Sequence, residues 1–195
     1  MSARWITDAE ELVALGPAWA ALCDRVPSSS PFERPEWLLP WVTVFGGRRR
    51  LRVLALERAG RLAALVPLVE AEANGAQRLG FLGAGVSDYH DAVLADDGPD
   101  LRAELWRALA RGAWTTCTLE RLRPGSPLLG PVPAGAEAIG GEPTAGEVCP
   151  ALAAAPGARS LGDLVPEGYA RRLARARRRA EAHHRLGFRS PATAA

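Results

Sequence analysis

The chain has 195 residues, enough for one domain with an appended segment, and its 48% hydrophobic and 24% charged residues are typical of a globular protein with a core. This composition excludes general disorder, and the longest apolar run, residues 62–69, is too short for a membrane helix. The net charge of +2 is unevenly distributed, because residues 171–185 hold seven arginines and one glutamate while the remainder holds more acidic than basic residues.

Two helices are expected first. Thr7 and Glu10 have the spacing of a capping box, and apolar residues then recur at helical intervals to Leu22, with a break left open at residues 16–17. Pro35 suits the first turn of a second helix. That helix carries a stripe of aromatic residues, which either packs in the core or lines a pocket for an acyl group or substrate: Trp37, Trp41 and Phe45.

The centre of the chain has the alternation of β-strands. Residues 51–56 and 61–69 flank a turn at Gly60 and predict a hairpin, in which Pro67 marks a bulge or an unpaired edge. A turn at residues 74–75 then leads to residues 77–82 as a third antiparallel strand. We therefore expect a three-stranded meander.

The second half of the chain gives mixed signals. Residues 97–99 start a helix that ends at Gly112, and residues 115–122 favour a strand. Residues 123–147 are rich in Gly, Pro and Ala and predict loops, with at most a short helix around 126–129, before a last strand at 148–153. The order predicts an α+β fold, with a mixed, mainly antiparallel sheet and helices on both faces.

The three cysteines, Cys23, Cys117 and Cys149, are too far apart and too few for a disulfide framework or a zinc site. We expect them to be small core residues and expect no metal site. The chain begins without the apolar segment of a secretion signal, so a cytoplasmic protein is expected.

Several stretches, in order, resemble the amino-terminal half of the GNAT-related acyltransferases labelled CelD-type cellulose-biosynthesis proteins, which are relatives of FemAB-like double-GNAT enzymes. The strongest stretch is Phe81–Tyr89, with Asp91 after it. The others are Pro31-Phe32, Pro35-Glu36-Trp37 with Trp41, Gly60 with Leu65-Val66-Pro67-Leu68, Ser126-Pro127-Leu128-Leu129, Cys149-Pro150 and the arginine run from Arg171.

The resemblance implies a GNAT-like domain over residues 1–160, followed by an arginine-rich linker helix and the start of a missing second GNAT-like half over residues 161–195. It implies transfer of an acyl group from acetyl-CoA or another acyl-CoA to a small-molecule or sugar-type acceptor. In such double enzymes the cofactor site is expected in the second half, so this chain would supply the substrate side and would be inactive alone.

The loop at residues 83–91 offers two sets of site residues. Gly83 and Gly85 suggest a phosphate-binding turn, but Gly80 occupies the place where that motif has Gln or Arg, and a tight turn is the alternative. The predicted catalytic cluster in this loop is Asp88, Tyr89, His90 and Asp91, which have the groups that acyl transfer needs. The alternative is that these side chains hydrogen-bond the local backbone or pack against neighbouring residues. Ser87 would contact substrate together with Trp37 and Trp41.

The arginine run forms an amphipathic helix with a narrow apolar stripe from Tyr169 to Ala180. Its arginines either bind an anion or form a solvated face, and the candidates for anion binding are Arg171, Arg172, Arg175 and Arg178. Nucleic acid is disfavoured as a partner because no aromatic residues are interleaved with the charges. His183 and His184 are adjacent and make a poor metal pair. The alternative functions are therefore a non-catalytic binding module and an anion- or nucleic-acid-binding protein.

Overall fold

The computed structural model describes residues 1–47, 49–96, 98–136, 143–146 and 156–184. The chain divides into two compact units, Met1–Gly146 and Glu147–Ala195. The first unit is an α+β fold, as the sequence predicts. Its helices are α1 (Ala9–Arg25), η1 (Pro31–Glu33), α2 (Pro35–Phe45) and α3 (Pro99–Ala110), and its strands are β1 (Ser2–Ile6), β2 (Arg50–Leu51), β3 (Val53–Arg58), β4 (Arg61–Val66), β5 (Leu68–Ala73), β6 (Ala76–Phe81), β7 (Val93–Leu94) and β8 (Thr116–Cys117).

One long hairpin runs through both sheets of this unit. β2 pairs with β5 at Leu51↔Val69, and β3 pairs with β4 in the same register at Leu54↔Val66. Pro67 lies between β4 and β5 and has no N–H to give to the ladder. The ladder is interrupted there, and the strands belong to two four-stranded sheets, ordered β1-β3-β4-β7 and β2-β5-β6-β8.

The predicted hairpin is confirmed, and so is the antiparallel pairing of the third strand with the end of the second, but the three strands do not lie in one sheet. β6 pairs with β5 in one sheet, whereas β3 and β4 pair in the other. The sequence marked an interruption at Pro67 without showing that the chain changes sheet there, because the change depends on which strands flank each half of the hairpin.

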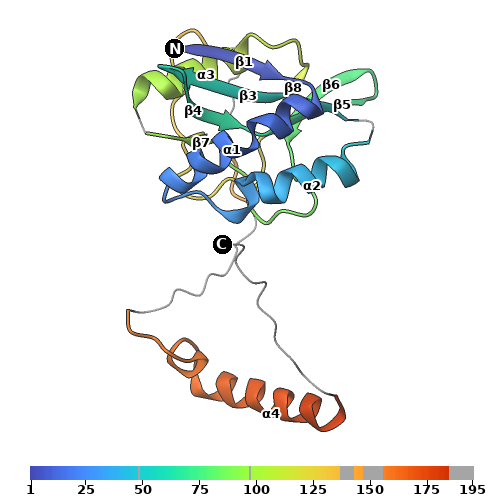
Figure 1. Cartoon of the computed structure of the whole chain (residues 1–195), viewed down its shortest axis with the longest axis vertical. Coiled ribbons are helices and arrows are strands. Elements are labelled where there is room, and N and C mark those ends of the chain that lie inside the picture. The colour runs from blue at the N-terminus through green and yellow to red at the C-terminus, as the bar shows by residue number, and fades with distance from the viewer. Residues whose placement is uncertain (48, 97, 137–142, 147–155, 185–195) are drawn as a thin grey trace. The chain divides into compact units, whose positions relative to one another are not determined.

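Helices cover both faces of the sheets, as predicted. Alternate residues of β3 point to opposite sides: Leu54 and Leu56 belong to the core beside α3, and Val53 and Ala55 to the core beside α1 and α2. Figure 1 shows α1 and α2 side by side on one face, with α3 on the other. The chain therefore buries a strand that is apolar on both faces.

One local prediction at the beginning of the chain is wrong, and the break left open at residues 16–17 is absent. The N-cap of α1 is Asp8 and not Thr7, since the Asp8 carboxylate accepts the amides of Glu10 and Glu11 at 2.9 and 3.0 Å. Pro17 does not divide the helix. It lies on the exposed side, where water can satisfy the carbonyl that loses its amide partner.

Two further elements differ from the sequence predictions. β1 was not expected, and it pairs with β3 along its whole length, although only Ile6 is fully buried. The strand expected over residues 115–122 is limited to Thr116–Cys117, which pairs in parallel with β6. Residues 126–129 form a turn closed by the amide of Leu129 and the carbonyl of Ser126, not a helix. The strand expected at 148–153 lies outside the described residues.

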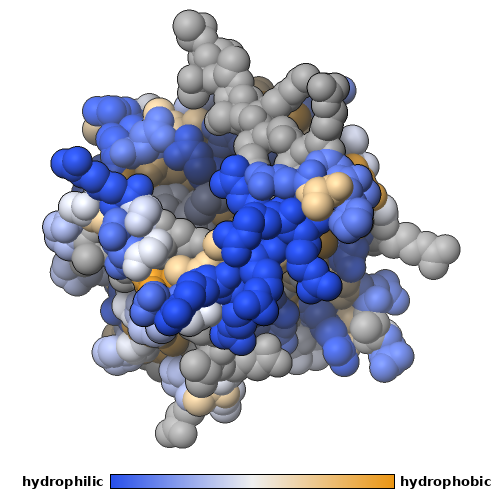
Figure 2. Space-filling view, turned by 90° about the horizontal axis from the view of Figure 1, so that it is seen from below, coloured by the Kyte–Doolittle hydropathy of each residue, from blue (hydrophilic) through white to orange (hydrophobic). Residues whose placement is uncertain are grey.

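The second unit contains the expected arginine-rich helix, α4 (Glu167–His183), preceded by η3 (Leu161–Asp163). No residue of α4 is buried, and Tyr169 and Leu173 are 47% and 38% exposed. Two ion pairs join residues four apart on this helix, Glu167–Arg171 at 3.2 Å and Arg177–Glu181 at 2.7 Å. Hydrophilic side chains predominate over this helix in Figure 2.

Across the described part of the chain, no helix combines the length and the apolar character needed to cross a membrane.

Candidate functional site

The loop of residues 83–91 begins where the sheets divide. β6 ends at Phe81, which pairs with Leu68 just after Pro67, and the Leu82 amide donates to the Pro67 carbonyl at 2.8 Å. The loop then leads to β7, which pairs with β4 just before Pro67. It therefore spans the break between the two sheets, and its position is set by the interrupted hairpin.

The two loop glycines have positive φ angles, +90° at Gly83 and +94° at Gly85. A Cβ atom at Gly83 would lie 2.7 Å from the Ser87 Oγ and 2.8 Å from a methyl group of Leu38. A Cβ atom at Gly85 would meet nothing within 4 Å. Both glycines thus permit a tight turn, and Gly83 also permits close packing. Their expected binding of a cofactor phosphate stays a prediction.

Ser87 and Trp37, two of the three residues predicted to contact substrate, lie against each other, and that contact with substrate stays a prediction. The Trp37 indole donates to the Ser87 hydroxyl at 3.0 Å, and that hydroxyl donates to the Gly83 carbonyl at 3.0 Å. Ser87 is 1% exposed, whereas Trp37 is 39% exposed. Ser87 therefore holds the loop to α2, and the accessible group of the pair is the indole.

His90 lies beneath the loop, 4% exposed, with its ring stacked on Phe81 at a centroid distance of 5.2 Å and an interplanar angle of 10°. Burial lowers the pKa of His90, and the backbone groups of Gly83 and Glu120 partly oppose this effect. Neither ring nitrogen makes a hydrogen bond of normal geometry to the described residues. The imidazole is therefore neutral at physiological pH and able to accept a proton only under acidic conditions.

Asp91 is also buried, 4% exposed, and its Oδ1 accepts the Ser126 hydroxyl at 2.7 Å and the Ala92 amide at 2.8 Å. Burial raises the pKa of Asp91 to about 6, against the effect of these two bonds. The Glu33 carboxylate adds to the rise. A carboxyl group with this pKa changes its protonation close to neutral pH, which suits a general base.

Glu33 is 1% exposed and belongs to the same buried cluster. One carboxylate oxygen accepts the Ser30 amide, and the other is 3.7 Å from a guanidinium nitrogen of Arg123. Arg123 also donates to the Ser28 carbonyl at 2.6 Å. Arg123 therefore lies beside Glu33, and both residues act electrostatically on Asp91: Glu33 raises its pKa and Arg123 lowers it.

Asp88 and Tyr89 occupy the outer part of the loop. Asp88 is exposed, and Tyr89 is half-buried between the Phe32 ring, at a centroid distance of 6.5 Å, and the Arg123 guanidinium, 6.0 Å from the ring centre. The four residues predicted as a catalytic cluster are thus adjacent in the chain but do not converge on one point. Two are internal and two face outward, and their catalytic role stays a prediction.

Sequence reasoning missed Glu33, Arg121, Arg123 and Ser126 as parts of this cluster. Arg121 donates to the Ser87 carbonyl at 3.2 Å. Ser30 and Glu33 have the spacing of a capping box, and that signal could have found the buried glutamate. The other three lie in a segment without regular structure, whose partners depend on the tertiary fold.

Trp41 lies one turn of α2 after Trp37 and has different surroundings. It is 4% exposed and lines a cavity of about 530 Å³ at the end of α2. Three arginines in and around β2 also line this cavity: Arg49, Arg50 and Arg52. The aromatic stripe is therefore neither simply core nor one pocket, since Trp41 is buried and Trp37 and Phe45 are exposed.

The remaining predicted residues form no enclosed site. Among the described residues, no group of three or more His, Cys, Asp or Glu side chains could hold a metal ion. Burial raises the pKa of the Cys23 thiol. It raises the pKa of the Cys117 thiol to about 11, so the Cys117 thiol stays protonated. Cys149 lies outside the described residues. The four arginines predicted to bind anions on α4 are exposed: Arg171, Arg172, Arg175 and Arg178.

Comparisons with protein-family models, with curated proteins and with solved structures found no match to this chain. The fold and site define an α+β protein with a buried acidic pair beside a glycine loop.

Proposed function

We propose that the chain supplies the acceptor side of an acyl-CoA-dependent acyltransferase, which transfers an acyl group to an amine or hydroxyl of a small molecule or sugar-type precursor. The proposal starts from the resemblance in residues 81–91. The observation that carries it is the raised pKa of Asp91, about 6, in the loop that spans the break between the sheets.

In this proposal Asp91 takes the proton that the acceptor loses. An amine must be deprotonated to attack a thioester, and a base with a pKa near the working pH does this best. Both hydrogen bonds to Asp91 end on Oδ1, so Oδ2 is the oxygen that would carry the proton. Burial keeps the pKa of Asp91 high, and the negative charge of Glu33 adds to this effect.

The outer part of the loop would meet the acceptor. Asp88 is exposed, Val86 is 46% exposed, and the Trp37 indole is 39% exposed and bonded to Ser87. A carboxylate next to apolar and aromatic surface suits an acceptor with an ammonium group or sugar hydroxyls. Acetyl-CoA or another acyl-CoA would be held by a second GNAT-like half.

Acyl transfer can be tested by supplying the carboxy-terminal half of a CelD-type acyltransferase in trans. The mixture is incubated with acetyl-CoA and a panel of amines, amino sugars and sugars, and acetylated products are detected by mass spectrometry. We expect product only with both halves present. Asp91→Asn should lower the rate by about a hundredfold or more, the usual contribution of a general base.

Asp96→Asn is the matched control, because Asp96 is an exposed acid that pairs with Arg58 just beyond β7. It should leave the rate unchanged. Equal rates for Asp91→Asn and wild type would contradict the assigned role. An acceptor that binds without ever being acetylated would favour a non-catalytic binding module.

Acetyl-CoA binding to the chain alone is the second test, measured by calorimetry. We expect no micromolar affinity. Micromolar binding that persists in excess pyrophosphate would place the cofactor site in this chain and contradict the division of labour between two halves.

A further inference from the structure

The cavity at the end of α2 has the composition of an anion site. It is lined by Thr7 and Ala9 from the start of α1, by Trp41, Val42, Gly46 and Gly47 at the end of α2, by residues 49–52 and by Val69. Its volume of about 530 Å³ falls within the usual range for small-molecule sites. No acidic residue is among the described residues that line it.

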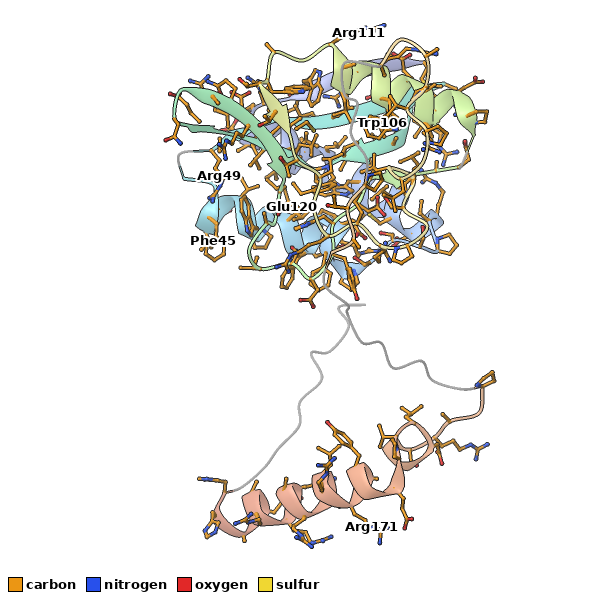
Figure 3. The ribbon with its side chains drawn as sticks, turned by 180° about the vertical axis from the view of Figure 1, so that it is seen from behind. Phe45, Arg49, Trp106, Arg111, Glu120 and Arg171 are labelled. Atoms are coloured by element: carbon orange, nitrogen blue, oxygen red, sulfur yellow. The ribbon has the colours of Figure 1, made fainter. Side chains whose placement is uncertain are left out.

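Two of the three arginines in this cavity are held in place by the fold. Arg49 donates to the Phe45 carbonyl at 2.9 Å, and its guanidinium lies 5.5 Å from the centre of the buried Trp41 ring. Figure 3 shows Arg49 and Phe45 close together at this end of α2. Arg52 donates through Nε to Glu70 at 2.6 Å, which leaves its two terminal nitrogens for other partners.

Arg50 differs from its neighbours. It is exposed on β2, where its backbone lies opposite that of Glu70 in β5. Its side chain makes no hydrogen bond or ion pair to the described residues. Since Glu70 neutralises Arg52, the cavity retains two positive charges, those of Arg49 and Arg50. The start of α1 adds little, because the Asp8 side chain already accepts two of its first free amides.

We propose that this cavity binds a phosphate-bearing small molecule. Two arginines without an acidic partner match a phosphate monoester, which carries a charge of about −1.5 to −2 at neutral pH. Guanidinium groups also fit phosphate oxygens in paired hydrogen bonds. The remaining space, beside Val42, Leu51 and Val69, accommodates the organic part of the ligand. This site is distinct from the glycine loop and does not depend on the proposed acyl transfer.

Indole NMR signals give a readout specific to this site. The chain has six tryptophans, all before residue 115, so none lies in the arginine-rich helix α4, whose charges could also attract phosphates. The chain is titrated with AMP, inorganic phosphate, adenosine and succinate, and the Trp41 signal is assigned with Trp41→Phe. We expect AMP and phosphate to move the Trp41 signal saturably, with a Kd below about 1 mM for AMP.

Matched arginine variants locate the binding. Arg50→Gln should weaken AMP binding about tenfold, since one charge-assisted contact is lost. Arg49→Gln with Arg50→Gln should remove the saturable shift. Arg78→Gln is the control, because Arg78 is likewise exposed on a strand of the same sheet without an ion pair to the described residues, and it should bind as wild type. Unchanged signals of the other indoles confirm that each variant is folded.

Several outcomes would overturn the proposal. These are the absence of a saturable Trp41 shift with AMP and phosphate, a Kd for Arg50→Gln equal to that of wild type, and an equal loss for Arg78→Gln. Succinate binding as tight as phosphate would show a general anion site and refute the phosphate assignment. Adenosine binding as tight as AMP would show that the arginines do not carry the affinity.

Discussion

The loop at residues 83–91 and the helix α4 use polar residues in opposite ways. In the loop, Ser87, His90 and Asp91 are at most 4% exposed. Each is bonded to a residue at least 30 positions away, Trp37, Arg121 and Ser126 respectively. In α4 no residue is buried, and the two ion pairs join residues four apart. The loop is therefore tied to the tertiary structure, whereas α4 is held by local bonds.

The loop and α4 would therefore contribute to function in different ways, the loop through the burial of its polar groups and α4 through its positive charge. Buried polar groups acquire shifted pKa values, as Asp91 does, because water no longer stabilises their charged forms. Exposed arginines interact weakly one by one and attract anions mainly through their summed positive charge. A specific reaction is thus more to be expected at the loop, and weak attraction of anions at α4.

The largest effect on stability should come from adding a side chain at Gly83, where the loop packs closely against its neighbours. Gly83→Ala places a Cβ at positive φ against Ser87 and the fully buried Leu38, and should lower the free energy of unfolding by about 3 kcal/mol. Gly85→Ala, with a similar φ and open space, should cost only about 1 kcal/mol. Urea denaturation measures both. Equal costs would show that backbone strain alone matters.

The pH dependence of stability should reveal the buried carboxyl. The pKa of Asp91 is raised to about 6 in the folded chain from 3.8, so the folded state binds more protons between these values. The free energy of unfolding therefore falls as pH rises from about 4 to 6, by about 2–3 kcal/mol from this group. Asp91→Asn should remove that fall.

Denaturation of both proteins at intervals between pH 4 and 7 measures the difference. Asp163 does not contribute in this range, because hydrogen bonds from Arg159 and Ser160 lower its pKa from 3.8, so its effect on stability falls below about pH 4. A wild-type profile parallel to that of Asp91→Asn would contradict the raised pKa.

The smallest effect should come from α4. Arg177→Gln removes the exposed pair with Glu181 and should weaken the hydrogen-exchange protection of the helix by about twofold. Arg178→Gln is the control, because Arg178 has no ion pair to the described residues. Hydrogen exchange of residues 167–183 measures the change. A loss of protection above about fivefold would mean that α4 is held by more than local bonds.

The sequence predicted the elements whose signals are local. α2, α3 and α4 follow from apolar spacing and from proline or acidic residues in the first turn, and the β3–β4 hairpin follows from its turn at Gly60. β1 was missed because it is short and only Ile6 is fully buried, so its pairing with β3 supplies most of its stability. The length of β8 was overestimated because strand propensity does not show whether a residue has a neighbouring strand to pair with.

The candidate site was only half predictable. Local sequence marked the glycines, Ser87, His90 and Asp91 as unusual, and Trp37 as a residue near them. Glu33, Arg123 and Ser126 were missed because they approach Asp91 from 58, 32 and 35 residues away, respectively, through contacts that no short window contains.

By itself the sequence determined an α+β chain with a glycine loop and an arginine-rich helix, because periodicity and turn residues are local properties. The tertiary structure decided that the hairpin enters two sheets at Pro67 and that Ser87, His90 and Asp91 point inward. It also decided that Trp41 lines one cavity together with three arginines. The physical reason is that burial and charge proximity, which set pKa and binding, arise only when distant segments pack together.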